Sequence, residues 1–194
     1  MRRICVYTGA NKGSRPEYEQ AAQAVGKELV ARGWGLVYGG GHTGLMGVLA
    51  DTVLAEGGEV IGVMPRAVIP QEIAHQGLTT FYEVKTMHER KALLADLADG
   101  FVTLPGGLGT YDELFEILTW AQLGMHQKPV GLLNVCGYFD PLLALLHQTM
   151  AERFMLASHV ELLLHKESPT DLLDCLAAYV PPPLQSKWTD PPAQ

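Results

Sequence analysis

Short apolar runs alternate with longer stretches of mixed polarity along most of the chain. Most of these short runs end close to glycine, proline or asparagine, as buried strands do where they lead into loops. The longer stretches repeat apolar residues at helical spacing. This alternation predicts an α/β fold built of βαβ units around a parallel sheet. Strands are expected at residues 4–7, 35–38, 59–63, 81–84, 100–104 and 129–134, with a weaker candidate at 162–165.

Helix starts are marked independently of this periodicity. A hydroxyl residue followed three positions later by Glu is the pattern of a capping box, in which each side chain bonds the other residue's backbone N–H. The pattern occurs at Ser14 with Glu17, at Thr86 with Glu89 and at Thr110 with Glu113. We therefore predict three helices that begin at these positions, each after an expected strand or its loop.

Length and charge narrow the class of protein. A chain of 194 residues with 47% hydrophobic residues can bury one large core, so we expect a single domain over residues 1–180. Residues 181–194 are proline-rich and are expected to form a flexible tail. The net charge of −7 provides no field that attracts nucleic acid or anionic lipid. An anionic small-molecule ligand would need a local basic pocket.

The compartment follows from cysteine usage and from the N-terminus. Cys5, Cys136 and Cys175 are far apart in sequence, and the first two lie in apolar, strand-like runs, so buried free thiols in a reducing cytoplasm are expected. The apolar run after Arg3 stops at Tyr7, which is too short for a signal peptide or a membrane span. We expect a soluble cytoplasmic protein.

Two glycine-rich loops are the first candidates for a binding site. Residues 39–44 read GGGHTG and residues 105–110 read PGGLGT, and each run follows an expected strand and opens a helix. Glycine lets backbone N–H groups approach phosphate oxygens without an intervening Cβ. Tight turns also need glycine, but two such loops in one small domain favour a phosphate cradle.

Gly39, Gly41 and Gly44 also satisfy G-x-G-x-x-G, so a dinucleotide oxidoreductase has to be weighed. The motif follows the second expected strand instead of the first, and Glu59 stands at the start of the next strand, where a ribose-binding carboxylate does not belong. The P-loop pattern G-x-x-x-x-G-K-[ST] is absent from the sequence.

Arg90 and Lys91 are candidate contacts for an anion. Arg90 lies on the apolar stripe of its helix with Leu93, Leu94 and Leu97, so its side chain should face inward or toward a cleft. Two cations in a first helical turn oppose the helix dipole, so a negatively charged group is expected beside them. A carboxylate partner or a phosphorylated substrate could do so.

Glu113 has two possible roles. In a capping box it would simply bond back to the backbone. The same position also places a carboxylate one turn above a glycine-rich anion cradle. Cleavage of a C–N bond at an anomeric carbon builds positive charge on the ribose and needs an aligned water, and a carboxylate serves both needs.

The sequence lacks the motifs of metal-dependent enzymes and of serine hydrolases. The seven histidines show neither H-E-x-x-H nor a zinc-type Cys/His spacing, so each is expected on the surface or satisfied in the core, and no metal site is predicted. There is no G-x-S-x-G sequence, which disfavours a serine hydrolase.

Taken together, these motifs resemble the Lonely Guy family of cytokinin riboside 5′-monophosphate phosphoribohydrolases. The resemblance is carried by residues 39–47, 87–91 and 105–113, the last of which follow P-G-G-x-G-T-x-x-E, and it extends from about Ile4 to Val180. It implies a Rossmann-like doubly wound parallel sheet flanked by helices, in a homodimer without metal or other cofactor. An older label of lysine decarboxylase, carried by some members, has no support here, because no lysine is marked for pyridoxal phosphate.

The resemblance also implies roles for individual residues. Arg90 and Glu113 match the catalytic Arg and Glu of the family. The expected substrate-binding set, with the glycine-loop residues included, is Glu72, Lys91, Gly106, Gly107, Leu108, Gly109, Thr110, Tyr111, Asp112, Thr119, Gly40, Gly41 and Gly44. One departure stands out, because the first strand leads into Thr8, Gly9, Ala10 and Asn11 where the family commonly has Cys-Gly-Ser-Ser. Two hydroxyls are absent, and Thr8 and Asn11 are candidates to replace them.

The function hypothesis is hydrolysis of the N-glycosidic bond of a purine riboside 5′-monophosphate, either AMP or a cytokinin-type nucleotide, without nucleic acid or membrane as partners. The alternative is a nucleotide or cofactor carrier on the same fold, without turnover. A dinucleotide oxidoreductase is the remaining rival. For the homodimer, the apolar helix through Leu114, Ile117, Leu118 and Leu123 offers a candidate face.

Overall fold

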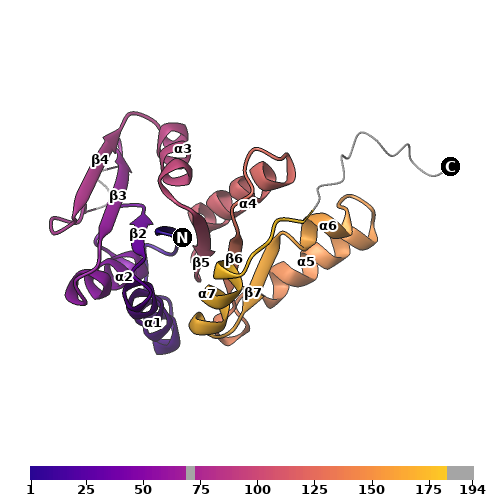
Figure 1. Ribbon diagram of the computed structural model, residues 1–194, viewed down its shortest axis with the longest axis horizontal. Helices are drawn as coiled ribbons and strands as arrows, with labels where there is room; N and C mark the ends of the chain where they lie inside the picture. Colours follow the sequence, from indigo (N-terminus) through magenta and orange to yellow (C-terminus); the bar gives the residue numbers. More distant parts are fainter. Residues whose placement is uncertain (69–72, 183–194) are drawn as a thin grey trace.

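A computed structural model describes residues 1–68 and 73–182. The described residues form one seven-stranded sheet in the order β4-β3-β2-β1-β5-β6-β7, and all neighbouring strands are parallel (Figure 1). The strands are β1 (Arg3–Tyr7), β2 (Gly35–Tyr38), β3 (Val60–Pro65), β4 (Thr80–Val84), β5 (Gly100–Thr103), β6 (Val130–Leu133) and β7 (Leu163–Lys166). Each one matches an expected run, and the predicted α/β fold is confirmed.

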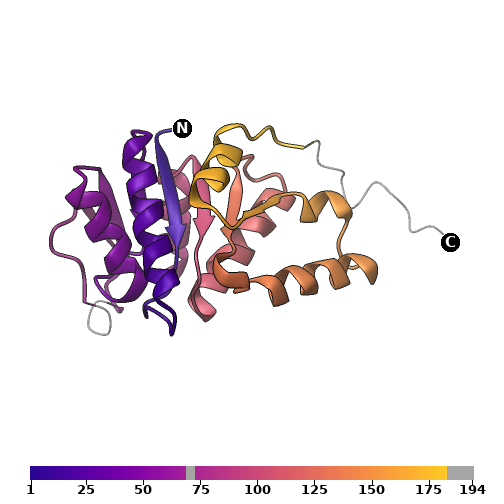
Figure 2. The ribbon, with the colours of Figure 1, turned by 90° about the horizontal axis from the view of Figure 1, so that it is seen from below.

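Helices cover both faces of the sheet (Figures 1 and 2). Their bounds are α1 (Pro16–Ala31), α2 (Gly44–Ala55), α3 (Met87–Leu97), α4 (Leu108–Gln122), α5 (Asp140–Ala151), α6 (Ala157–Val160) and α7 (Pro169–Ala177), with a short 3₁₀ turn, η1 (Val135–Gly137). Buried residues of α1, α2 and α7 form one core cluster, and those of α3, α4 and α5 form the other. The sheet is therefore doubly wound.

The strands are apolar without interruption because both of their faces are buried. In β1, Ile4 and Val6 belong to the core on the α1 side, whereas Cys5 and Tyr7 belong to the core on the α3 side. Successive side chains of a strand point to opposite faces, so a strand between two helical layers needs apolar residues at every position. Burial also raises the pKa of the Cys5 thiol well above its ordinary value.

The strand order reverses between β1 and β5. From β1 the chain proceeds outward through β2, β3 and β4, and it then returns through α3 to place β5 against the free side of β1. The loops after β1 and β5 therefore leave toward opposite faces and open a crevice between them. Ligands of such sheets bind at this point, outside the carboxyl ends of the strands.

Two of the three predicted helix starts are wrong. The helix α1 begins at Pro16 with Arg15 at its N-cap, because the fixed φ of proline suits the first helical position, and Ser14 lies before the cap. The helix α4 begins at Leu108 with Gly107 at its N-cap, so Thr110 lies inside the first turn and Glu113 lies further along the helix. Gly107 takes the extended cap conformation at the end of the glycine run.

The third predicted start is confirmed and supports α3. The Oγ1 atom of Thr86 accepts a hydrogen bond from the Glu89 N–H at 3.1 Å, and the Glu89 carboxylate accepts one from the Lys85 N–H at 2.8 Å.

We predict that Thr86→Ala lowers the free energy of unfolding by about 1 kcal/mol, the usual cost of a lost N-cap. Urea denaturation would measure this. Thr149→Ala, inside α5, is the control and should change stability by no more than a few tenths of a kcal/mol.

Two further expectations fail. Cys136 is exposed instead of buried, because β6 ends at Leu133 and the chain turns sharply at Cys136 with a φ of 52°. Leu114 and Ile117 do not form an outer face of α4, because they pack into the core on the α3 side.

None of the helices in residues 1–68 and 73–182 has the length and apolar character that a membrane span requires. Residues 183–194 lie outside the described part of the chain, so the predicted tail stays a prediction.

Candidate active site

A cavity of about 370 Å³ lies at the point where the strand order reverses. Its volume is in the range of small-molecule sites. Loops after β1 and β5, the beginnings of α1, α2, α3 and α4, and Tyr138 just after η1 all contribute to it. The lining residues are Val6, Thr8, Gly9, Ala10, Asn11, Lys12, Gly13, Tyr18, Gly39, Leu45, Met46, Arg90, Pro105, Gly106, Gly107, Gly109, Thr110, Glu113 and Tyr138.

The loop that contributes Pro105, Gly106, Gly107, Gly109 and Thr110 to the cavity has features that favour an anion. Gly107 at the N-cap of α4 has no side chain, so the first N–H groups of the helix are not covered by one. These groups carry the positive end of the helix dipole, which attracts phosphate. Gly106 is held tightly, since a Cβ there would lie 2.1 Å from Thr110 Oγ1 and 2.8 Å from the Gly9 nitrogen. A side chain at Gly106 would therefore spread the loop.

The carbonyl groups of the same loop bond to neighbouring donors. The Pro105 oxygen accepts hydrogen bonds from the Gly9 N–H at 3.1 Å and from the Thr8 hydroxyl at 3.2 Å. The Gly106 oxygen accepts one from the Tyr138 hydroxyl at 2.5 Å. Burial, with a hydrogen bond from Tyr111 as the next cause, raises the pKa of Tyr138 to about 12, so this hydroxyl stays protonated and keeps donating. The carbonyl oxygens of Pro105 and Gly106 are therefore both occupied by hydrogen-bond donors.

Arg90 and Glu113 lie together at the wall of the cavity. Their side chains are 9% and 11% exposed, and Arg90 Nη2 lies 3.8 Å from Glu113 Oε1. Arg90 Nε donates to the Val63 oxygen at 3.1 Å, and Nη2 donates to the Gly39 oxygen at 3.4 Å. The prediction that Arg90 faces inward is confirmed, and backbone groups from two strand ends fix its guanidinium.

Lys91 points elsewhere. Its Nζ lies 3.1 Å from Asp112 Oδ2 and 3.0 Å from Glu116 Oε1, both on α4. Among the described residues, Lys91 is outside the set that lines the cavity. The negative charge that was expected to compensate the two cations of α3 therefore comes from α4 in both cases, through Glu113 for Arg90 and through Asp112 and Glu116 for Lys91.

The 39–44 loop packs against the first loop, and only one of its glycines lines the cavity. Gly39 reaches the cavity, whereas Gly40, Gly41 and Gly44 do not. The Leu45 and Met46 N–H groups at the start of α2 donate to the Gly9 oxygen at 3.1 and 3.4 Å, so that oxygen already occupies them. Gly44 has a φ of +62°, and a Cβ there would lie 2.2 Å from the Ala10 backbone. Its glycine is needed for close packing on the first loop.

The other expected binding residues are scattered. Leu108 is 88% exposed and lies outside the lining set. Tyr111 donates from its hydroxyl to that of Tyr138 at 3.1 Å and so contributes indirectly. The Thr119 hydroxyl bonds its own helix at the Phe115 oxygen, away from the cavity. Glu72 lies outside the described residues.

Several lining residues were not in the expected set. Lys12 lies in the first loop, where its Nζ pairs with Glu19 at 3.0 Å, and Tyr18 of α1 meets Tyr138 edge-on at 5.7 Å between ring centroids. The position of the first loop after β1 could have pointed to Lys12. Tyr138 follows β6, and its proximity becomes evident only when the strand order is known.

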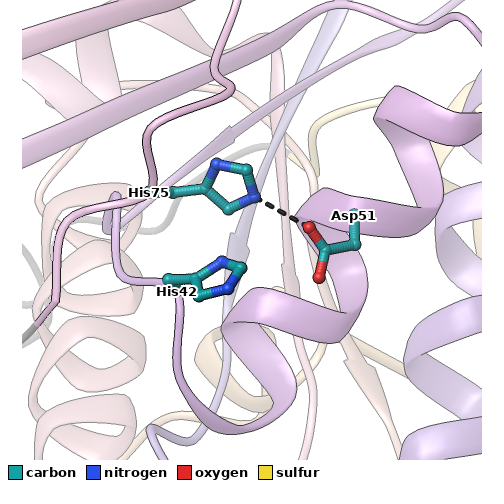
Figure 3. Close-up of side chains that lie close together, drawn as sticks. All are labelled: His42, Asp51 and His75. Carbon is teal, nitrogen blue, oxygen red and sulfur yellow. Dashed lines mark hydrogen bonds and ion pairs between the residues drawn. The ribbon is translucent and has the colours of Figure 1, made fainter.

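Outside the cavity, His42, Asp51 and His75 lie close together (Figure 3), with possible ligand atoms within 4.8 Å of one another. His75 Nε2 is 2.8 Å from Asp51 Oδ1, and His75 Nδ1 accepts the Gly77 N–H at 3.0 Å. A neutral imidazole that accepts at Nδ1 carries its proton on Nε2. Metal binding at Nε2 would move that proton to Nδ1, against the Gly77 donor. The tautomer thus favours a His75–Asp51 hydrogen bond over a metal site.

Comparison with known proteins identifies the family. A family model described as "Possible lysine decarboxylase" matches residues 46–176. The chain is 47% identical over 181 residues to the cytokinin riboside 5′-monophosphate phosphoribohydrolase LOG of Oryza sativa subsp. japonica, with 93% of this chain and 75% of the relative covered. It belongs to the Lonely Guy family. LOG2 of Arabidopsis thaliana, another member, is 42% identical over 181 residues, which cover 93% of this chain and 85% of that protein.

Solved structures show how widely the Lonely Guy scaffold is shared. The molybdenum cofactor carrier protein of Chlamydomonas reinhardtii matches 92% of this chain with a TM-score of 0.69 and 22% identity, over 99% of its own chain. A molybdenum cofactor binding protein of Rippkaea orientalis matches 91% with a TM-score of 0.68 and 20% identity, over 96% of its own chain. At this level of identity the likeness concerns the fold alone.

Proposed function

We propose that this protein hydrolyses the N-glycosidic bond of a purine riboside 5′-monophosphate, either AMP or a cytokinin-type nucleotide, to free base and ribose 5-phosphate. The observation that carries the proposal is the Arg90–Glu113 pair at the wall of a cavity whose floor is an anion cradle. The relatives named as phosphoribohydrolases match over 93% of the chain and support the same reaction.

In this proposal the 5′-phosphate binds at the N-terminus of α4. The N–H groups of Gly107 and Gly109 and the side chain of Thr110 would donate hydrogen bonds to it, since these residues line the cavity at the start of the helix. Thr8 stabilises the loop through Pro105, and Asn11 is among the residues that line the cavity. These two residues take the place of the hydroxyls that the family commonly has after its first strand.

Arg90 and Glu113 then act on the ribose and its leaving base. As the C1′–N bond lengthens, positive charge develops on the ribose ring, and the Glu113 carboxylate stabilises it or accepts a proton from the attacking water. The water's oxygen bonds to C1′, and the electron pair of the broken bond leaves with the base, which takes up a proton. Arg90 orients the nucleotide and holds Glu113 in place at 3.8 Å.

Phosphorus NMR on the wild-type protein tests which bond breaks. Incubation with AMP should convert its phosphorus signal to that of ribose 5-phosphate. Release of inorganic phosphate would indicate a phosphatase and contradict the proposal. An unchanged signal at saturating AMP with measurable binding would favour a carrier without turnover, as the named functions of the structural neighbours suggest.

The close contact between Gly39 and Arg90 yields a prediction. A Cβ at Gly39 would lie 2.0 Å from Arg90 Nη2, so the guanidinium must move to admit it. Gly39→Ala should lower base release by roughly tenfold or more, because displacements of about 1 Å cost up to about 10²-fold in rate. Chromatography of the free base would measure this. Gly57→Asn is the control, because residue 57 has open space around it and Asn tolerates its positive φ.

We further propose that the protein works as a cytoplasmic homodimer. An apolar groove beside α4 is lined by Phe115, Leu118, Met155 and Val160, and exposed Leu123 lies at the end of the same helix. A second copy of the chain would cover this surface. Light scattering on the eluting protein should give twice the 21.1 kDa chain mass. A single-chain mass at working concentration would refute the dimer.

A further inference from the structure

Lys12 belongs to the first loop, which lies directly against the anion cradle at residues 105–110. The Gly9 N–H donates to the Pro105 oxygen at 3.1 Å, and a Cβ at Gly9 would lie 3.2 Å from the Gly106 Cα atom. Three residues later the chain reaches Lys12, which lines the same cavity as the cradle. The backbone before Lys12 is therefore anchored on the cradle itself.

The chain after Lys12 leads back to the same loop. Gly13 has a φ of +78°, and a Cβ there would lie 2.7 Å from the Tyr18 ring, so the turn packs closely on that ring. Tyr18 meets Tyr138 edge-on, and the Tyr138 hydroxyl donates to the Gly106 oxygen. The backbone on both sides of Lys12 is thus held against the cradle.

Lys12 supplies the net positive charge of the cavity lining. Among the described lining residues, the charged side chains are Lys12, Arg90 and Glu113, two cations and one carboxylate. Arg90 lies 3.8 Å from Glu113, so these two charges largely offset each other. Lys12 instead pairs at 3.0 Å with Glu19 of α1, which is not among the described lining residues.

The Lys12–Glu19 pair is exposed enough to exchange for another partner. The two side chains are 56% and 35% exposed. Ion pairs in such surroundings contribute little to stability, because water screens both charges. A phosphate dianion in the cradle would offer the ammonium group a stronger partner, and the flexible side chain of lysine can rotate toward it.

We propose that Lys12 determines specificity for a phosphorylated ligand, because its ammonium group leaves Glu19 and pairs with the 5′-phosphate in the cradle. This role rests on the proposed function, which places that phosphate at the N-terminus of α4. Glu19 is then a competitor that holds Lys12 while the cavity is empty. Removal of Lys12 should weaken the binding of a phosphate ester, whereas removal of Glu19 should strengthen it.

Calorimetry with ribose 5-phosphate at low ionic strength tests these opposite effects. Lys12→Met should raise the dissociation constant roughly tenfold, as the loss of one charge-assisted hydrogen bond does. Lys12→Arg should keep most of the affinity. Glu19→Gln should lower the dissociation constant about twofold or more, and it should lose this effect when Lys12→Met is also present. Lys27→Met, at an exposed position of α1, is the control and should match the wild type.

A purely structural role of the ion pair predicts a different result. Loss of either partner would then loosen the first loop, and both single variants would bind ribose 5-phosphate more weakly. That result, an unchanged dissociation constant in Lys12→Met, or no binding by the wild type would overturn the proposal. The measurement does not depend on turnover. A wild-type protein that bound ribose 5-phosphate but released no base from AMP would remove the proposed hydrolysis and leave the phosphate contact of Lys12 to be decided by the variants.

Discussion

Glu113→Gln should lower the rate of base release by roughly 10²- to 10⁴-fold, the range typical of a positioned acid, base or charge stabiliser. Glutamine keeps the size of the side chain but removes the charge that would face the developing positive ribose. Because Glu113 lies beside the buried Arg90, the substitution also removes the carboxylate charge next to that cation. The rate constant should therefore fall far more than substrate affinity. Steady-state assays of free base from AMP would separate kcat from KM.

The control for this prediction is Glu28→Gln on α1. Glu28 pairs with Arg32 one turn away, far from the cavity, and its loss should leave turnover unchanged. Circular dichroism should show both variants folded. A folded Glu113→Gln protein that retained more than about a tenth of wild-type turnover would exclude Glu113 from the chemistry.

Arg90→Lys should lower turnover by about 10²-fold or more, comparable with the loss of one preorganised electrostatic donor in other active sites. The guanidinium donates through Nε to Val63 and through Nη2 to Gly39 while it lies beside Glu113. The ammonium group of lysine, on a flexible chain, cannot make both of these hydrogen bonds in the same geometry. The substitution therefore keeps the positive charge but loses its position. The assay is again the release of free base from AMP.

Arg66→Lys provides the matched control. Arg66 pairs with Glu83 at the surface, where its side chain is 82% exposed and either cation can serve. Its turnover should equal that of the wild type. If Arg90→Lys retained wild-type turnover, as Arg66→Lys should, the hydrogen-bonding geometry of the Arg90 guanidinium would have no part in catalysis.

The fold was predictable because its signal lies in consecutive residues. Ile4 and Cys5 face opposite cores, and a run of such positions predicts a doubly covered strand without knowledge of its neighbours. Thr86 with Glu89 marked a true helix start for the same local reason. The helix start predicted at Thr110 in the PGGLGT run was wrong, because Gly107 takes the cap position three residues earlier. Backbone conformation decides such a cap, and the side-chain pattern does not record it.

The site was predictable only where one segment supplies the chemistry. Arg90 was expected to face inward from the helical stripe, and it does. Tyr138 was missed, because it reaches the 105–110 loop only through the placement of β5 between β1 and β6, and Lys12 was missed although it follows the first strand. The expected substrate contact of Lys91 rested on the family resemblance and on its charge, and the structure adds its ion pairs with Asp112 and Glu116 on another helix.

The most direct test of the account is chromatographic measurement of free base released by the wild-type protein from isopentenyl-AMP and AMP, with adenosine alongside. The cradle at residues 105–110 predicts release from the monophosphates and little or none from adenosine, which has no phosphate to anchor. Equal release from adenosine, or no release from either monophosphate, would contradict it.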